Sequence, residues 1–167
     1  MKPYGKLYPT AALALIATLL ATPALLAQGN GEFKYWSAFQ LDNLGRSLAG
    51  EVGANNTALL DRIVDEGNYF AAIVHREPGP GFSEAHADWA DIYFVTAGNA
   101  SLVVGGTITD AEETEPGEFR GSMIEGGTLQ RLAEGDVVHI PAGTAHHVRV
   151  EPGEQVTYFI VKIRAAP

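Results

Sequence analysis

The sequence predicts an all-β protein, an antiparallel sandwich or barrel with one N-terminal helix beside it. Three observations support this prediction. Short runs rich in β-branched and aromatic residues recur through the second part of the chain, turns containing Gly and Pro separate these runs, and apolar residues with helical spacing occur in one segment. Many short strands with tight turns and a single helix are typical of a two-layered antiparallel fold.

The first 27 of the 167 residues resemble a secretory signal peptide. Residues 1–6 carry two lysines and no acid, and residues 11–27 are almost wholly apolar. This apolar run is short for a membrane span, which needs about 20 apolar residues. We therefore expect cleavage after Ala27 and a secreted or periplasmic protein, with an uncleaved N-terminal anchor as the alternative. Residues 28–36 are then a flexible leader, and residues 37–167 form one domain.

The mature chain is strongly acidic and contains no cysteine. Removal of the two lysines with the signal peptide leaves 9 basic and 20 acidic residues, a formal net charge of −11. Such a charge disfavours nucleic acid as a partner and gives no attraction to anionic lipid, so we expect no stable membrane insertion after cleavage. Without disulfides, the domain must be held by its core alone or by a bound metal.

One amphipathic helix is predicted at residues 38–49. Leu41, Leu44 and Leu48 have helical spacing, Ser37 is a suitable N-cap, and Gly50 can end the helix. We expect this helix to pack on the domain.

The strands are predicted from runs of β-forming residues bounded by Gly and Pro. They are residues 59–64 (a strand or a helical turn), 69–76, 92–96, 100–104, 129–132, 137–140, 146–150 and 156–163. Gly98-Asn99 predicts a hairpin between two of these strands. Residues 110–118, which include five acidic residues, are interpreted as a solvated hairpin connection, with a calcium site or a mobile lid as alternatives.

Two distant segments place histidines and acids where a metal site is plausible. His86 and Asp88 lie two apart, so both side chains point to one face if the segment is extended. Asp91 opens an apolar strand, and an ionised carboxylate there needs a cation or several donors. His146 follows a rigid Pro-x-Gly turn. We therefore predict His86, Asp88, Asp91 and His146 as ligands of a divalent transition metal (Fe, Mn, Zn or Ni), with Asp oxygens favouring Mn²⁺ or Fe²⁺.

The same segments resemble the two signature motifs of the cupin superfamily. The first motif is H-x-H, three or four residues, E, six residues, G; the second is G, five residues, P-x-G, two residues, H. The second is complete from Gly135 to His146. The first keeps His86 and Gly98, but Asp88 replaces the second histidine and Asp91, at a shorter spacing, replaces the glutamate.

The resemblance implies an antiparallel cupin β-barrel, a jelly-roll-like double sheet, and the chain is similar to small secreted bacterial cupins. It leaves open a homodimer, because cupins are often dimers. His75, Tyr93 and Val95 are predicted to line the ligand pocket. Our leading hypothesis is a metal-binding cupin that binds or transforms a small polar molecule. The alternatives are a metal-free module for a sugar or organic acid, and a structural or interaction protein. No motif indicates a reaction type.

Overall fold

The computed structural model describes residues 32–49, 51–52 and 59–166. The predicted signal peptide and residues 28–31 of the predicted leader lie outside these residues. Residues Phe33–Pro167 form one compact unit. Within the described part of the chain, no helix has the length and apolar character that a membrane span requires.

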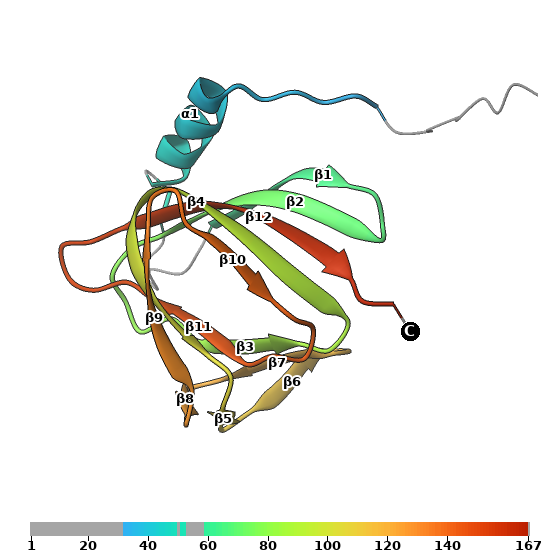
Figure 1. The fold of residues 1–167 in the computed structure, drawn as a ribbon, viewed down its shortest axis with the longest axis vertical. Helices are drawn as coiled ribbons and strands as arrows, with labels where there is room; N and C mark the ends of the chain where they lie inside the picture. Colours follow the sequence, from blue (N-terminus) through green and yellow to red (C-terminus); the bar gives the residue numbers. More distant parts are fainter. Residues whose placement is uncertain (1–31, 50, 53–58, 167) are drawn as a thin grey trace, which may run out of the picture. The chain divides into compact units, whose positions relative to one another are not determined.

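The described chain consists mainly of antiparallel strands, as the sequence predicts. In chain order they are β1 (Leu59–Asp65), β2 (Tyr69–Arg76), β3 (Ser83–His86), β4 (Trp89–Val104), β5 (Thr107–Thr109), β6 (Glu112–Glu115), β7 (Glu118–Gly121), β8 (Met123–Glu125), β9 (Thr128–Ala133), β10 (Val137–Ile140), β11 (His146–Arg149) and β12 (Val156–Arg164). They form two facing layers (Figure 1). The pairing path runs from β1 to β6 and does not close into a ring among the described strands.

The long strand β4 belongs to both layers. Its first half pairs with β10 and β12, next to β2 and β1, and its second half pairs with β9 and β11. In the second layer β11 pairs with β3, which pairs with β7 and then β6. Since β3 and β11 lie side by side and the start of β4 lies in the opposite layer, residues from all three strands can meet between the layers.

The predicted hairpin at Gly98-Asn99 is wrong, because both residues lie within β4. Gly98 has a φ of 76°, and a Cβ at this position would lie 1.9 Å from the carbonyl oxygen of Gln155. The amide of Asn99 donates to the same oxygen over 2.8 Å. The glycine therefore bends one strand from the first layer into the second, where a hairpin would have reversed the chain.

The helix α1 (Ala38–Ala49) has the predicted bounds. Its first turn is closed by a capping box, since the amide of Gln40 donates to Ser37 Oγ over 3.3 Å and the amide of Ser37 donates to Gln40 Oε1 over 2.8 Å. The helix lies outside the two layers and contacts β2 (Figure 1).

The predicted strands 92–96 and 100–104 are both parts of β4, which begins three residues earlier, at Trp89. The other predicted strands agree with the structure to within one or two residues, and the segment at 59–64 is a strand. The acidic segment forms the hairpin of β6 and β7, and the side chains of β6 are exposed. This confirms the interpretation as a solvated hairpin connection.

The hydrophobic core lies between the layers. Its buried members include Val74, Tyr93, Leu102, Val148 and Tyr158. Full burial of such side chains contributes about 1.5–3 kcal/mol each. The buried polar residues Arg76, His86, Asp91 and His146 lie among these core strands. The core therefore holds a polar cluster on rigid strands.

Candidate metal centre

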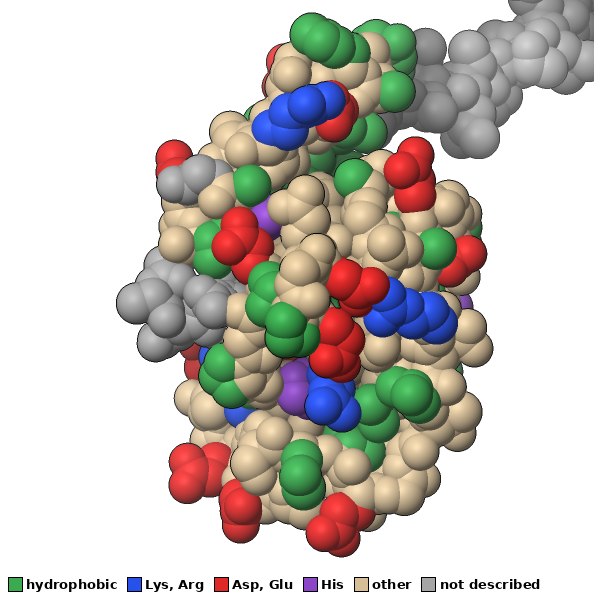
Figure 2. All heavy atoms as spheres, turned by 90° about the vertical axis from the view of Figure 1, so that its left-hand side faces the viewer, with side chains coloured by type: hydrophobic (Ala, Val, Ile, Leu, Met, Phe, Trp, Pro, Cys, Tyr) green, Lys and Arg blue, Asp and Glu red, His purple; other side chains and the backbone are tan. Residues whose placement is uncertain are grey.

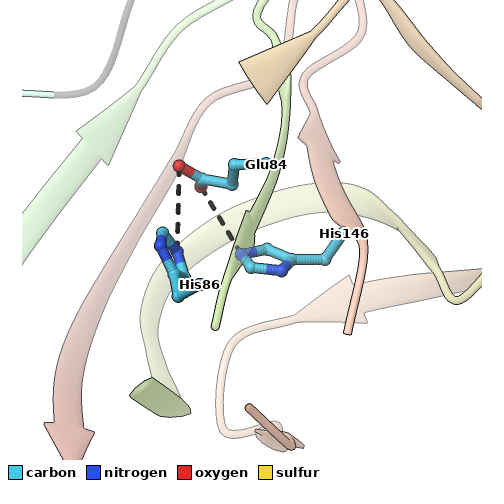
Figure 3. Close-up of side chains that lie close together, drawn as sticks. All are labelled: Glu84, His86 and His146. Atoms are coloured by element: carbon cyan, nitrogen blue, oxygen red, sulfur yellow. Dashed lines mark ion pairs between the residues drawn. The ribbon is translucent and has the colours of Figure 1, made fainter. Parts of the chain in front are cut away.

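Two imidazoles and two carboxylates meet between the layers. Glu84 and His86 lie on β3, Asp91 on β4, and His146 at the start of β11. Nε2 of His146 is 3.5 Å from an oxygen of Glu84 and 3.5 Å from Oδ2 of Asp91. Nε2 of His86 is 4.0 Å from Glu84 Oε2 and 3.7 Å from Asp91 Oδ2. Figure 3 shows both imidazoles turned toward the carboxylate of Glu84.

These separations are compatible with one shared ion. Two ligand atoms that each lie about 2.1 Å from an ion are at most about 4.2 Å apart, and the four nitrogen–oxygen distances above meet that limit. The donor atoms of Glu84, His86 and His146 all lie within 4.8 Å of one another.

With a neutral ring, His146 presents an unprotonated nitrogen to the cluster. Its side chain is 1% exposed, and its Nδ1 is 3.0 Å from the carbonyl oxygen of Thr144. Because a carbonyl oxygen only accepts, Nδ1 donates and carries the proton, and in the neutral ring Nε2 keeps its lone pair. Within the described residues this Nε2 has no hydrogen-bond partner.

His86 is oriented in the same way by an acid of the β6–β7 hairpin. Its Nδ1 is 2.5 Å from Oε2 of Glu118, which as a carboxylate accepts the hydrogen bond. The buried Nε2 of His86 also lacks a hydrogen-bond partner among the described side chains and backbone groups. A histidine whose outer nitrogen donates to a carboxylate or carbonyl is the usual arrangement of a metal-binding histidine.

Asp91 is 1% exposed, and a cation neutralises it. Nζ of Lys162, on β12, lies 2.7 Å from Oδ1 and 2.9 Å from Oδ2. The hydroxyl of Tyr93 donates to Oδ2 over 3.2 Å. These contacts offset the free-energy cost of burying an ionised carboxylate, which would be large without partners.

Glu84 has a second cation beside it. Nη2 of Arg76 donates to Glu84 Oε1 over 3.4 Å, and the Nε of the same guanidinium donates to the hydroxyl of Tyr158. Burial raises the pKa of Glu84, but the guanidinium of Arg76 and the charges of His146 and His86, when these rings are protonated, lower it by more, and the net pKa is well below the ordinary value. Glu84 is therefore ionised and able to act as an oxygen ligand at neutral pH.

A cavity of about 420 Å³ adjoins the cluster. Glu84, His86 and Lys162 contribute to its lining, together with the aromatic rings of Phe70 and Trp89 and with residues 114–116, 118 and 120 of the β6–β7 hairpin. A cavity of this size, with aromatic walls and charged groups of both signs, can hold a small polar molecule next to Glu84 and His86.

Of the four predicted ligands, the structure brings together His86, Asp91 and His146 and leaves Asp88 outside the cluster. β3 ends at His86, so Asp88 lies in the turn before β4 and the alternation of an extended segment does not reach it. Its side chain is 65% exposed, with Arg164 Nη1 4.0 Å from its Oδ2.

The second carboxylate of the cluster comes from Glu84, which was not predicted as a ligand, in place of the predicted Asp88. Glu84 and His86 alternate on β3, as the two histidines of the H-x-H motif would. With His86 in the second place, four residues separate it from Asp91, which fits the family spacing of three or four. The spacing is therefore a signal for Glu84 in the sequence, although a glutamate stands where the motif has its first histidine.

The three predicted pocket residues separate into two places. Tyr93 contacts Asp91 in the cluster. His75 and Val95 line a different cavity beside α1. Neighbouring residues on a strand point to opposite faces, and since Arg76 points between the layers to Glu84, His75 faces the helix instead.

Comparisons with known proteins agree with the observed fold. Residues 67–166 match the sequence profile of the AraC-like ligand binding domain. No curated protein matches the chain. Among solved structures, it is similar to an uncharacterized conserved protein with a double-stranded β-helix domain from Klebsiella pneumoniae, with 16% identity, coverage of 81% of this chain and 100% of that one, and a TM-score of 0.54.

Two further structures have lower TM-scores. The DMSP lyase DddQ from Ruegeria pomeroyi has 20% identity and a TM-score of 0.46, with coverage of 64% of this chain and 46% of that one. This chain thus spans less than half of that lyase. A cupin-like protein from Thermotoga maritima also has 20% identity, with a TM-score of 0.45 and coverage of 64% of this chain and 68% of that one.

Proposed function

Because this chain belongs to the AraC-like ligand binding domain family of the cupin superfamily, we propose that it holds a divalent metal ion between Glu84, His86, Asp91 and His146 and binds a small polar molecule beside it. One observation carries the proposal. Two buried imidazole nitrogens that have no hydrogen-bond partner in the described part of the chain face two carboxylates, and an outer oxygen acceptor fixes the orientation of each ring.

The donor set fits Fe²⁺ or Mn²⁺ best. Two neutral imidazoles with one or two carboxylates form the set that non-haem Fe²⁺ and Mn²⁺ sites use. A bound ion would supply Lewis acidity toward an oxygen of the ligand. Lys162 and Arg76 already neutralise the two carboxylates, so an added ion would give the centre a net positive charge and favour ligands with anionic or carbonyl oxygens.

Metal analysis of the untagged protein tests this proposal. We expect near-stoichiometric Fe or Mn in the purified protein, and a melting temperature that falls on chelation and recovers on addition of Mn²⁺. Metal-free protein that is well folded, with a melting temperature unchanged by Fe²⁺, Mn²⁺, Zn²⁺ or Ni²⁺, would contradict it.

Glu118 is expected to act as a positioning residue through His86. Glu118→Ala removes the acceptor of the Nδ1 proton, so the ring can rotate or change tautomer, and we expect Mn²⁺ affinity to fall by about 10–100-fold. Isothermal titration with Mn²⁺ measures this. Glu115→Ala is the matched control, since Glu115 lines the same cavity and loses the same charge but has no contact with His86 among those the structure shows. Equal losses in both variants would indicate a general charge effect.

The metal-free binding module is the second proposal, and the Lys162–Asp91 pair favours it. Lys162 Nζ is within 2.9 Å of both oxygens of Asp91 and supplies the cation that the carboxylate needs. In that case the cluster hydrogen-bonds a sugar or an organic acid directly. Thermal-shift screening of such molecules in the presence of a chelator distinguishes the two proposals, because only the metal-free module is stabilised under that condition.

Export completes the proposal. The basic start and apolar run of residues 1–27 support a secreted or periplasmic location. N-terminal sequencing of the protein from fractionated cells should give a start at Gln28 in the periplasm or medium, and recovery of the full-length chain from the cytoplasm alone would contradict export.

A further inference from the structure

A second cavity, of about 530 Å³, lies between α1 and the adjacent strands. Its lining includes Leu41, Gly45 and Ala49 of the helix and His75, Val95 and Thr157 of the strands. We propose that this cavity is a second binding site, for a small, uncharged and mostly apolar molecule that carries one hydroxyl group.

The sequence of α1 creates this space. Ala38, Leu41, Gly45 and Ala49 repeat at three- and four-residue intervals and so form one face of the helix, which lines the cavity. Three of these four residues are small, whereas the large Phe39 is 72% exposed. A helix that served only for packing would present its large apolar residues to the strands.

Gly45 fixes the helix at one point of close contact. A Cβ on Gly45 would lie 2.8 Å from Cγ2 of Thr157, so the helix backbone approaches β12 as closely as glycine allows. The small side chains of Ala38 and Ala49 on the same face then leave room between helix and strands. The cavity is thus a consequence of residue size on a helix that is held at a fixed distance.

His75 is a buried side chain in which, among the described residues, one ring nitrogen has a hydrogen-bond partner and the other has none. The side chain is 2% exposed, and its Nδ1 lies 2.8 Å from Oγ1 of Thr157. Its Nε2 is buried and has no hydrogen-bond partner among the described residues. Oε1 of Glu77 is 3.6 Å away from Nε2, beyond hydrogen-bonding distance. A buried ring nitrogen in this state is unfavourable, and a ligand group could satisfy it.

Either His75 or Thr157 can be the donor of the hydrogen bond between them, and this choice determines what Nε2 of His75 offers to a ligand. If Thr157 donates, Nε2 carries the proton and is a donor; if Nδ1 donates, Nε2 is an acceptor. A hydroxyl group both donates and accepts, so it matches Nε2 in either tautomer. The metal centre has no such ambiguity, because carbonyl and carboxylate oxygens fix its histidines.

The charges around the cavity disfavour an anion. Asp42 and Arg46 pair with each other over 2.5 Å, and Glu134 adds a negative charge to the lining for which the described residues show no ion pair. Figure 2, in which α1 is at the top, shows acidic side chains distributed over the surface below the helix. Apolar walls such as Leu41 and Val95 favour an uncharged body.

Fluorescence titration of the full chain with 2-naphthol tests the proposal, with naphthalene as the probe without a hydroxyl. We expect saturable 1:1 binding of 2-naphthol. Ala49→Phe, which fills the cavity, should weaken this binding more than about tenfold. His75→Phe keeps a ring but removes the nitrogen, and should weaken 2-naphthol about fivefold, the effect of one hydrogen bond, while naphthalene is unchanged. His139→Phe is the matched control, because His139 is exposed on β10 and lines neither cavity.

Circular dichroism confirms that each variant is folded before titration. The double variant with His86→Ala and His146→Ala should bind 2-naphthol as the unaltered chain does, which separates this site from the metal centre. The absence of saturable binding, full affinity in Ala49→Phe, or loss of binding in the double variant would each overturn the proposal. Equal effects of His75→Phe on 2-naphthol and naphthalene would overturn the assignment of the hydroxyl.

Discussion

Replacement of either His86 or His146 by alanine is expected to weaken Mn²⁺ binding by more than about 100-fold. Loss of a residue that only orients a ligand typically costs 10–100-fold, and loss of the ligand itself must cost more. Both Nε2 atoms are buried, point to the same two carboxylates and have no hydrogen-bond partner among the described residues. Isothermal titration of chelator-treated protein with Mn²⁺ measures the loss.

The same substitution on β10 provides the control. His139 is exposed and lies outside the cluster, so His139→Ala should bind Mn²⁺ with unchanged affinity. If His86→Ala or His146→Ala binds Mn²⁺ as tightly as His139→Ala does, the metal is held elsewhere or by the acidic surface in general, and the proposed centre is wrong.

Replacement of Lys162 by methionine is expected to destabilise the metal-free protein and to tighten Mn²⁺ binding. Lys162 is the cation that neutralises Asp91, which is 1% exposed. Removal of one partner of a buried ion pair costs about 3–5 kcal/mol, because the remaining charge is uncompensated. Since Mn²⁺ can replace the missing ammonium group, the metal should restore most of the lost free energy of unfolding.

Urea unfolding with chelator and with Mn²⁺ measures both effects. Arg164→Met is the matched control, because Arg164 also lies on β12 and faces an aspartate, but this pair is exposed on both sides. We expect it to change the free energy of unfolding by less than about 1 kcal/mol, with or without Mn²⁺. If Lys162→Met destabilises the protein and Mn²⁺ gives no recovery, then Asp91 serves an ion pair alone and is not available to a metal.

Local patterns in the sequence were sufficient to predict most of the secondary structure. The bounds of α1, β2 and β10 agree with the structure, since a capping box, apolar spacing and Gly or Pro turns are encoded within a few residues of each element. The hairpin at Gly98-Asn99 failed because these two residues allow either a reversal or a bend. The bend is stabilised by the carbonyl oxygen of Gln155, which lies far away in sequence, contacts Gly98 and accepts a hydrogen bond from Asn99.

The site residues that belong to a sequence motif could be predicted. The residues that reach the site through the pairing of distant strands could not. His86 and His146 followed from the motifs, whereas the role of Asp88 depended on where β3 ends. Lys162 carries no signal in the sequence, since its contact with Asp91 follows from the register in which β12 lies beside β4. Arg76 reaches Glu84 from β2, a strand that does not pair with β3.

An anomalous-scattering map of a crystal grown with Mn²⁺ tests the central claim most directly. We expect one strong peak about 2.0–2.2 Å from Nε2 of His86 and of His146, with oxygens of Glu84 and Asp91 in the same coordination shell. A peak among the exposed acids of β6 would contradict this claim. So would the absence of a peak between the two imidazoles in crystals grown with saturating Mn²⁺.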